Sequence, residues 1–290
     1  MTEQGYYIIF LVLFLITGVC VGSFMNVVIY RLPRIIFGAD EHDDKRFSLA
    51  WPPSHCPRCQ SRIRFYDNIP VVSWLILRGK CRCCLTRISA LYPLTEVIIG
   101  LWFVIVYLLV ISVNTFLTFS NMLDLLPPIV LFCLLYCITV IDFRYFLIPD
   151  ILSFGLMWSG LLFSVCGVIN ISPFQAIFSC VLTYCLISIV KQGYRVIRKY
   201  DGLGSGDAKL FAAATVWLGL NQISWLILFS AICGGVLYGI QLFYRRTFSV
   251  ILFNSLLEQN DDNNIQTDGI YIPFGPAIAI TTLTLYLAHI

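Results

Sequence analysis

The stretch that decides the fold class is Ile151 to Val190, ILSFGLMWSGLLFSVCGVINISPFQAIFSCVLTYCLISIV. It holds no Asp, Glu, Lys or Arg over 40 residues, whereas about 20 mostly apolar residues are enough for a helix to cross a bilayer. The segment Asn170-Ile-Ser-Pro173 in its middle is a turn signal. We therefore expect two membrane helices joined by a tight external hairpin.

The composition of the whole chain agrees with this interpretation. Of its 290 residues, 59% are hydrophobic and only 12% are charged, about half the charged share of soluble domains. A chain this apolar is neither a soluble globular protein nor a disordered one. Its 12 cysteines lie mostly in apolar runs, which excludes a small disulfide scaffold.

Further charge-free runs account for the other membrane helices. They are Gly5–Tyr30, Val97–Leu123, Leu125–Ile141, Leu210–Tyr244, which is split near Gly219, and Gly269–Ile290. The first run lacks a preceding basic residue and a following cleavage site, so we interpret it as a retained helix and not as a signal peptide. The sequence thus predicts an all-α polytopic membrane protein with about eight transmembrane helices.

The distribution of basic residues gives the expected orientation and domain order. The segment 31–92 carries 11 of the 19 Lys and Arg residues, and the expected outer loops carry none. Because cytoplasmic loops are enriched in basic residues, this segment is placed in the cytoplasm. We expect a first transmembrane helix over 1–30, a small cytoplasmic domain over 31–96, and a membrane domain of about seven helices over 97–290.

Two cysteine pairs mark the cytoplasmic domain as a metal-binding one. Cys56-Pro-Arg-Cys59 and Cys81-Arg-Cys-Cys84 are separated by 21 residues, which fits a site of four thiolates around zinc. Reduced cytoplasmic thiols favour a metal over disulfides, and a domain of this size has little core of its own. A redox pair is the alternative. His55 and Cys83 are spare candidates that we do not expect to bind the metal.

Two carboxylates are predicted at the cytoplasmic edge of the membrane. Asp142 ends one apolar run, and Asp207 follows the glycine-rich Gly202-Leu-Gly-Ser-Gly206. Ionisable groups at such places are functional candidates by default. Two carboxyls that share a proton can act as general base and general acid on a peptide bond. The loop glycines Gly204 and Gly206 would then take unusual dihedral angles and let a substrate backbone approach.

Structural explanations of the same carboxylates stay open at this point. Asp207 precedes a good helix sequence and is also a candidate N-cap. Asp142 is also placed to pair with Arg144. Asp150 follows Pro149 before an apolar run, which is a helix-start pattern.

Several sequence blocks in order resemble the bifunctional type IV prepilin peptidases. The blocks are Gly22-Ser-Phe-Met-Asn26 and its continuation to Pro33, the two Cys pairs, Asn68-Ile-Pro70, Leu77-Arg-Gly-Lys-Cys81, Tyr92-Pro-Leu-Thr-Glu96, Ile141-Asp142, Ile148-Pro-Asp150, Gly204-Ser-Gly-Asp207 and Pro273-Phe-Gly-Pro276. The resemblance covers almost the whole chain. A Leu at position 91, where the family often has Arg, is one departure from its pattern.

The resemblance implies a membrane aspartic peptidase of the GxGD type in the bacterial inner membrane. Such an enzyme cuts the short basic leader from prepilins or pseudopilins at the cytoplasmic face and then N-methylates the new N-terminus with S-adenosylmethionine. It implies catalytic roles for Asp142 and Asp207, a supporting role for Asp150, and a link of Gly79 with methyl transfer. The four paired cysteines become structural zinc ligands.

Other functions remain as alternatives. The chain could be a peptidase without methyltransferase activity, because no glycine-rich nucleotide loop marks a cofactor pocket. A transporter or a non-enzymatic membrane scaffold would also use membrane-edge carboxylates. The expected partners are prepilins and membrane lipid, and no nucleic acid. One further hypothesis assigns an acidic cluster, Asp40, Glu41, Asp43 and Asp44, to attraction of the basic leader.

Overall fold

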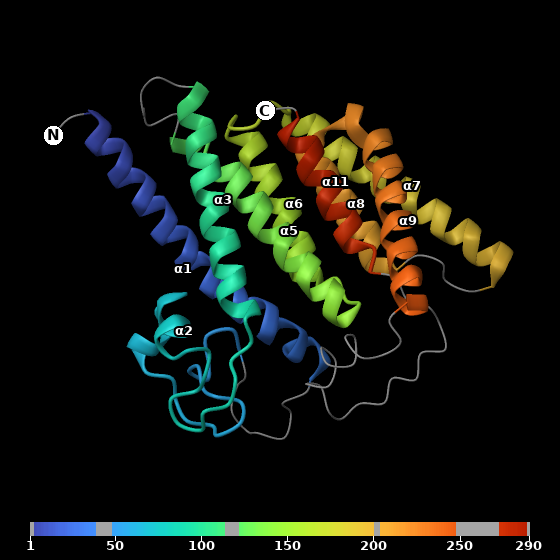
Figure 1. Ribbon diagram of the computed structural model, residues 1–290. Helices are drawn as coiled ribbons and strands as arrows, with labels where there is room; N and C mark the ends of the chain where they lie inside the picture. The colour runs from blue at the N-terminus through green and yellow to red at the C-terminus, as the bar shows by residue number, and fades with distance from the viewer. Residues whose placement is uncertain (1–2, 39–47, 114–121, 200–203, 248–272, 289–290) are drawn as a thin grey trace. The chain divides into compact units, whose positions relative to one another are not determined.

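The computed structural model describes residues 3–38, 48–113, 122–199, 204–247 and 273–288. Over these residues the chain is helical, and its only extended pairing is two isolated β-bridges. It divides into two compact units, Met1–Cys137 and Ile138–Ile290, which are described separately (Figure 1). The expected all-α architecture is confirmed.

Unit 1 is built on a close pair of long helices, α1 (Glu3–Phe37) and α3 (Leu91–Val113). Small residues let the two backbones approach: a Cβ on Gly18 would lie 2.9 Å from the Gly100 Cα, and a Cβ on Gly100 would lie 2.6 Å from a Val19 methyl. Small residues at such crossings are typical of membrane helix pairs, where packing replaces the hydrophobic effect. Ile99 and Phe103 of α3 belong to the buried core of this unit.

Helix α1 continues past Tyr30, where the charge-free run ends. The first charged residue, Arg31, is buried, and its guanidinium donates hydrogen bonds to the carbonyl oxygens of Ser48 at 3.0 Å and Pro52 at 2.6 Å. A buried charge is tolerated when such partners satisfy it. The end of the uncharged run is therefore not the end of the helix, which continues to Phe37.

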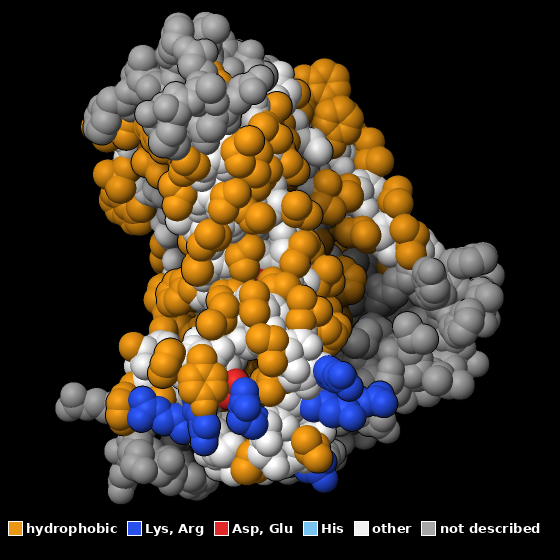
Figure 2. Space-filling model, turned by 60° about the vertical axis from the view of Figure 1, so that its left-hand side comes forward, with side chains coloured by type: hydrophobic (Ala, Val, Ile, Leu, Met, Phe, Trp, Pro, Cys, Tyr) orange, Lys and Arg blue, Asp and Glu red, His pale blue; other side chains and the backbone are white. Residues whose placement is uncertain are grey.

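Between α1 and α3 lies a segment of turns with two short helices, a 3-10 turn (Phe65–Asn68) and α2 (Val72–Ile76). It carries the four paired cysteines. Seven Lys and Arg residues of 48–90 are all exposed, and Figure 2 shows such side chains gathered at one end, with hydrophobic side chains covering the helices. This distribution agrees with a polar domain at a membrane surface.

Unit 2 surrounds the short helix α8 (Ser205–Leu218), ten of whose residues are buried. It packs against α6 (Asp150–Val165), α7 (Pro173–Arg198) and α11 (Gly275–Leu287). The Trp217 indole donates a hydrogen bond to the Leu156 carbonyl at 2.8 Å, and a Cβ on Gly160 would lie 2.7 Å from that indole nitrogen. Helix α8 is thus the buried centre of this unit.

Two further helices complete the membrane region, α5 (Leu126–Tyr145) and α9 (Ile223–Thr247). The described residues contain eight helices of at least 13 residues. Five of them, α1, α3, α5, α7 and α9, are long and apolar enough to cross a membrane, and α6 and α11 are shorter apolar helices. The stretch 151–190 forms two helices, α6 and α7, as expected, with the turn before Pro173.

Candidate functional site

The four paired cysteines converge in unit 1. The sulfur atoms of Cys56 and Cys84 are 3.7 Å apart and those of Cys59 and Cys81 are 4.0 Å apart, with all four within 4.8 Å of one another. Sulfur atoms about 3.8 Å apart are what a tetrahedral zinc ion with bonds of about 2.3 Å requires. The cluster predicted from the spacing is therefore present and has the donor set and size for zinc.

The two cysteine pairs sit on turns of the same construction. In the first, the amide N–H of Cys56 donates to the Ser61 carbonyl at 3.0 Å, and in the second that of Cys81 donates to the Thr86 carbonyl at 2.8 Å. The residue after each second cysteine has a positive φ, 55° at Gln60 and 58° at Leu85. This repeated geometry points both pairs of sulfur atoms toward one point.

Side-chain hydroxyls lower the pKa of one thiol in each cysteine turn. Ser61, through its side chain and then its backbone, lowers the pKa of Cys59 to about 6. Thr86 likewise lowers the pKa of Cys84. Because metals bind the thiolate form, these hydroxyls favour a metal site. The spare candidates lie outside the cluster: His55 hydrogen-bonds the Pro53 carbonyl, and Cys83 is exposed.

A buried carboxylate ties the cysteine segment to α3. Glu96 is 8% exposed and accepts a hydrogen bond of 2.7 Å from the backbone N–H of Val71. Val71 has φ of 59°, which is unfavourable for a β-branched residue and persists only where contacts hold it. A Cβ on Gly22 would lie 2.7 Å from the Glu96 Cα, so α1 also closes on this position.

Gly79 connects α2 with the second cysteine turn. Its φ is +67°, and a Cβ would lie 2.9 Å from the Trp74 ring. Its N–H donates to the Trp74 carbonyl at 2.9 Å, and its carbonyl accepts from Ile88 at 2.7 Å. The positive φ and the close approach of Trp74 thus explain why a glycine occupies position 79.

In unit 2, Asp142 lies in the last turn of α5 and is 4% exposed. Its carboxylate accepts a hydrogen bond of 2.8 Å from the N–H of Gly275, the first residue of α11. A Cβ on Gly275 would lie 2.7 Å from the same oxygen. The unpaired N–H groups and the dipole at a helix N-terminus favour a negative charge, so α11 begins where it stabilises the Asp142 carboxylate.

Asp207 is the third residue of α8, and its carboxylate accepts a hydrogen bond of 3.1 Å from the N–H of Gly204. Gly204, and not Asp207, is the N-cap. The expected unusual dihedral angles are absent: Gly204 has φ of −60°, and Gly206 lies inside the helix. Both glycines instead provide space, because a Cβ would lie 2.9 Å from the Asp207 carboxylate at Gly204 and 2.9 Å from Ile148 at Gly206.

Packing of α8 on α11 brings the two carboxylates into one region. The Phe211 ring lies 6.0 Å from that of Phe274, which immediately precedes α11. The negative charge of Asp207 acts on Asp142, and the positive charge of Lys191 on α7 acts on Asp207. An acid pair beside a helix N-terminus is an arrangement that can activate water.

The other carboxylate expected near this site has a different environment. Asp150, the first residue of α6, receives two hydrogen bonds of 2.7 Å from the Lys209 ammonium. The Asp150 side chain is 55% exposed. This ion pair joins α6 to α8 two residues beyond Asp207.

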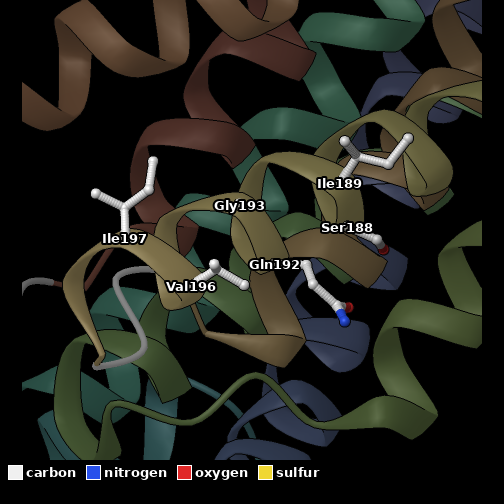
Figure 3. A pocket seen from close by; sticks show the side chains of 6 residues that line it. All are labelled: Ser188, Ile189, Gln192, Gly193, Val196 and Ile197. Atoms are coloured by element: carbon white, nitrogen blue, oxygen red, sulfur yellow. The ribbon is translucent and has the colours of Figure 1, made fainter.

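A hollow of about 600 Å³ lies away from these groups. It is lined by residues of α7 alone, Ser188, Ile189, Gln192, Gly193, Val196 and Ile197 (Figure 3). These side chains carry no acid, thiol or imidazole group. It is a surface groove of one helix and not a candidate catalytic site.

Sequence reasoning assigned no role to Gly275 or Lys191. The signal for Gly275 was present, because it lies in the block Pro273-Phe-Gly-Pro276, and a proline just inside a helix start is favourable. Nothing local in the sequence connects Lys191 with Asp207. The acidic cluster 40–44 lies outside the described residues.

Comparison with known proteins shows that each unit matches a peptidase family model. Residues 16–110 match the bacterial peptidase A24 N-terminal domain, and residues 129–240 match the type IV leader peptidase family. The two matches include the four paired cysteines and both Asp142 and Asp207. No solved structure matches the chain.

Several similar proteins carry the same description. A prepilin leader peptidase/N-methyltransferase of Dickeya chrysanthemi is 34% identical over 78% of this chain and 81% of its own length. The protein of that name from Aeromonas salmonicida is 34% identical over 90% of this chain and 84% of its own length. The protein of that name from Neisseria gonorrhoeae is 35% identical over 76% of this chain and 78% of its own length.

Proposed function

The chain belongs to the prepilin leader peptidase/N-methyltransferase family, and from this premise we propose that Asp142 and Asp207 are the catalytic pair of its peptidase. The protein is an enzyme that cleaves the leader of prepilins and methylates the N-terminus that results. The observation that carries the assignment is that α8, which carries Asp207, packs through Phe211 against Phe274 at the start of α11, where the Asp142 carboxylate is bound by Gly275.

In the proposed reaction one carboxylate is ionised and the other protonated. The ionised group takes a proton from water while that water attacks the scissile carbonyl carbon. The protonated group donates its proton to the carbonyl oxygen. When the carbon–nitrogen bond breaks, the group that took the proton from water passes it to the leaving amine, and the other group takes a hydroxyl proton back as the new carbonyl forms. Gly275 and Gly204, which donate hydrogen bonds to the two carboxylates, hold them in place as positioning residues.

The position of the pair suits a substrate that is part helix and part polar leader. Asp142 lies near one end of a helix long enough to cross the membrane. We propose that the apolar helix of a prepilin lies in the bilayer and that its basic leader stays in the cytoplasm, so that the bond between them reaches this edge. The basic charge of 31–92 and the positive-inside rule support an inner-membrane protein whose active site faces the cytoplasm.

We assign a structural zinc ion to the cysteine cluster. Cys56, Cys59, Cys81 and Cys84 would hold it, and four thiolates leave no open position for catalysis. The ion would join the two cysteine turns. It would thereby stiffen a small domain that has little core of its own.

For the second activity we propose S-adenosylmethionine as the methyl donor, which supplies an electrophilic methyl group to the new amine. The resemblance links Gly79 with this step. The positive φ of Gly79 and its contact with Trp74 support an indirect role, in which the glycine maintains the segment that carries methyl transfer.

A processing assay in purified membranes tests the peptidase assignment. Asp142→Asn and Asp207→Asn keep the side-chain shape and remove the acid, and each is expected to lower prepilin cleavage at least about a hundredfold. Asp124→Asn is the matched control, because it also removes a carboxylate, one that is exposed just before α5 at the opposite end of that helix from Asp142, and it is expected to retain cleavage. Normal cleavage by either of the first two variants, at normal protein levels, would remove that residue from the mechanism.

A further inference from the structure

The short helix α2 presents an apolar face that remains exposed among the described residues of unit 1. Val72, Leu75 and Ile76 are 48%, 61% and 71% exposed. They stand at positions i, i+3 and i+4, so they share one side of the helix. Ile69, just before α2, is 48% exposed and extends the surface. We call Ile69, Val72, Leu75 and Ile76 the α2 face.

The opposite side of α2 is fixed to the rest of its segment. Ser73 is buried, and its hydroxyl donates to the Tyr66 carbonyl at 2.9 Å. The Trp74 indole donates to the Ile88 carbonyl at 3.2 Å, and its ring lies against Gly79. Because two side chains anchor the inner side, α2 cannot turn over to bury the α2 face within the domain.

The link between Val71 and Glu96 sets the depth of α2 relative to the bilayer. Val71 directly precedes α2, and its N–H is bonded to Glu96, the sixth residue of the candidate span Leu91–Val110. Five residues of helix correspond to about 7.5 Å, so α2 is held about 7.5 Å along α3 from its first residue. An interfacial helix buries its apolar face about 5–10 Å into the boundary of head groups and acyl chains, so the two lengths agree when the bilayer boundary lies at the start of the candidate span.

The charge around the α2 face fits an anionic surface. Residues 48–90 contain seven Lys and Arg and only one acid, Asp67, which is paired with Arg82 at 2.6 Å. Arg78 and Lys80 are exposed and follow α2 directly. Figure 2 shows, on the face in view, Lys and Arg side chains next to hydrophobic ones.

We propose that the α2 face inserts into the cytoplasmic leaflet, with Arg78 and Lys80 bound to anionic phospholipid head groups. The cysteine segment is then attached to the bilayer at a third place besides α1 and α3. Contact with lipid removes exposed apolar area from water, and basic residues near an anionic leaflet add attraction. A basic prepilin leader would be repelled by the same charges. The inference does not depend on the catalytic assignment.

Photocrosslinking of the full-length protein in lipid vesicles tests this proposal. The photoreactive residue p-benzoylphenylalanine replaces Ile76, with Leu85 as the matched control site because it is 69% exposed on the second cysteine turn. The vesicles contain phosphatidylcholine with phosphatidylglycerol. After illumination, intact-protein mass spectrometry measures the share of protein that carries a lipid. We expect several times more lipid adduct at position 76 than at position 85.

A second variant tests whether the charges of Arg78 and Lys80 contribute to the lipid contact, or whether the α2 face merely lies near lipid. With the probe at position 76, Arg78→Gln combined with Lys80→Gln is expected to lower the lipid adduct several-fold in vesicles with phosphatidylglycerol. The same change should have little effect in phosphatidylcholine alone. If the probe at Ile76 prevents accumulation, Leu75 serves as the site, since it is 61% exposed on the same face.

Three results would overturn the proposal. They are equal lipid adducts at positions 76 and 85, a crosslink at position 76 to a second copy of this chain, and a crosslink there to added prepilin in place of lipid. Prepilin cleavage measured on the same samples reports on Asp142 and Asp207 separately. A failure of the lipid result with intact cleavage therefore rejects the membrane contact alone.

Discussion

The carboxylate of Asp142 and the backbone N–H of Gly275 are joined by a hydrogen bond of 2.8 Å across 133 positions of the sequence. This bond places one carboxylate at the start of α11. The second carboxylate, Asp207, lies at the start of α8, which packs against α11. The geometry of the acid pair therefore depends on a glycine that carries no chemistry of its own.

The first prediction concerns Gly275→Ala. Its Cβ would lie 2.7 Å from the Asp142 carboxylate oxygen, so the carboxylate or the start of α11 must move. Crowding of this kind costs about 1–3 kcal/mol. We expect a large loss of prepilin cleavage together with a lower melting temperature in detergent.

The control for that prediction is Gly235→Ala in α9, where a Cβ meets nothing within 4 Å. This change should leave cleavage unchanged and should not lower stability, because alanine favours a helix over glycine. Equal cleavage by the two alanine variants would contradict a positioning role for Gly275.

The second prediction concerns the metal. Cys59→Ser removes one of the four converging thiols, whereas Cys83→Ser removes an exposed thiol outside the cluster. We expect purified Cys59→Ser protein to lose its zinc and Cys83→Ser protein to keep it, because a site of four thiolates depends on each of them. Elemental analysis of zinc per protein chain makes the comparison, and equal zinc in both variants would argue against the site.

The third prediction concerns Glu96. Glu96→Ala leaves the Val71 N–H without its acceptor, and an unsatisfied buried donor costs about 1–3 kcal/mol. We expect limited proteolysis to cut the cysteine segment faster in this variant. Glu96→Gln keeps an amide oxygen that can accept the bond, so it should behave nearly as the wild type. Identical proteolysis of all three proteins would show that this link does not hold the segment.

The fourth prediction compares two glycines with positive φ. Gly79 and Gly167 have φ of +67° and +69°, but a Cβ on Gly79 would lie 2.9 Å from Trp74, whereas one on Gly167 meets nothing within 4 Å. A left-handed residue with a side chain costs about 1–2 kcal/mol, and Gly79→Ala adds crowding to that cost. Thermal unfolding should show the larger destabilisation for Gly79→Ala, and a larger effect at Gly167 would be inconsistent with this packing.

Local patterns explain which features could be predicted from the sequence. The uncharged stretch 151–190 divides into α6 and α7 at its turn signal, because length and hydropathy decide membrane helices. The cysteine cluster was predicted because the spacing within each pair is a property of a single turn. The membrane-edge places of Asp142 and Asp207, expected from the ends of apolar runs, stay a prediction.

Features that depend on distant contacts could not be predicted. No local signal shows that Gly275 donates to Asp142, or that Arg31 is buried against backbone carbonyls beyond the expected end of α1. The expectation that Gly206 is needed for unusual dihedral angles was wrong. This glycine instead leaves space for Ile148, which belongs to another part of the chain. Such close approaches are properties of the packed helices and become visible only in three dimensions.

The central claim is that Asp142 and Asp207 act as one catalytic unit, and double-variant kinetics test it most directly. Groups that act together show strongly non-additive losses. Cleavage rates of Asp142→Asn, Asp207→Asn and the double variant should therefore fall to the same low level, with normal amounts of protein in the membrane. Losses that multiply in the double variant, or cleavage that survives either single change, would contradict the account.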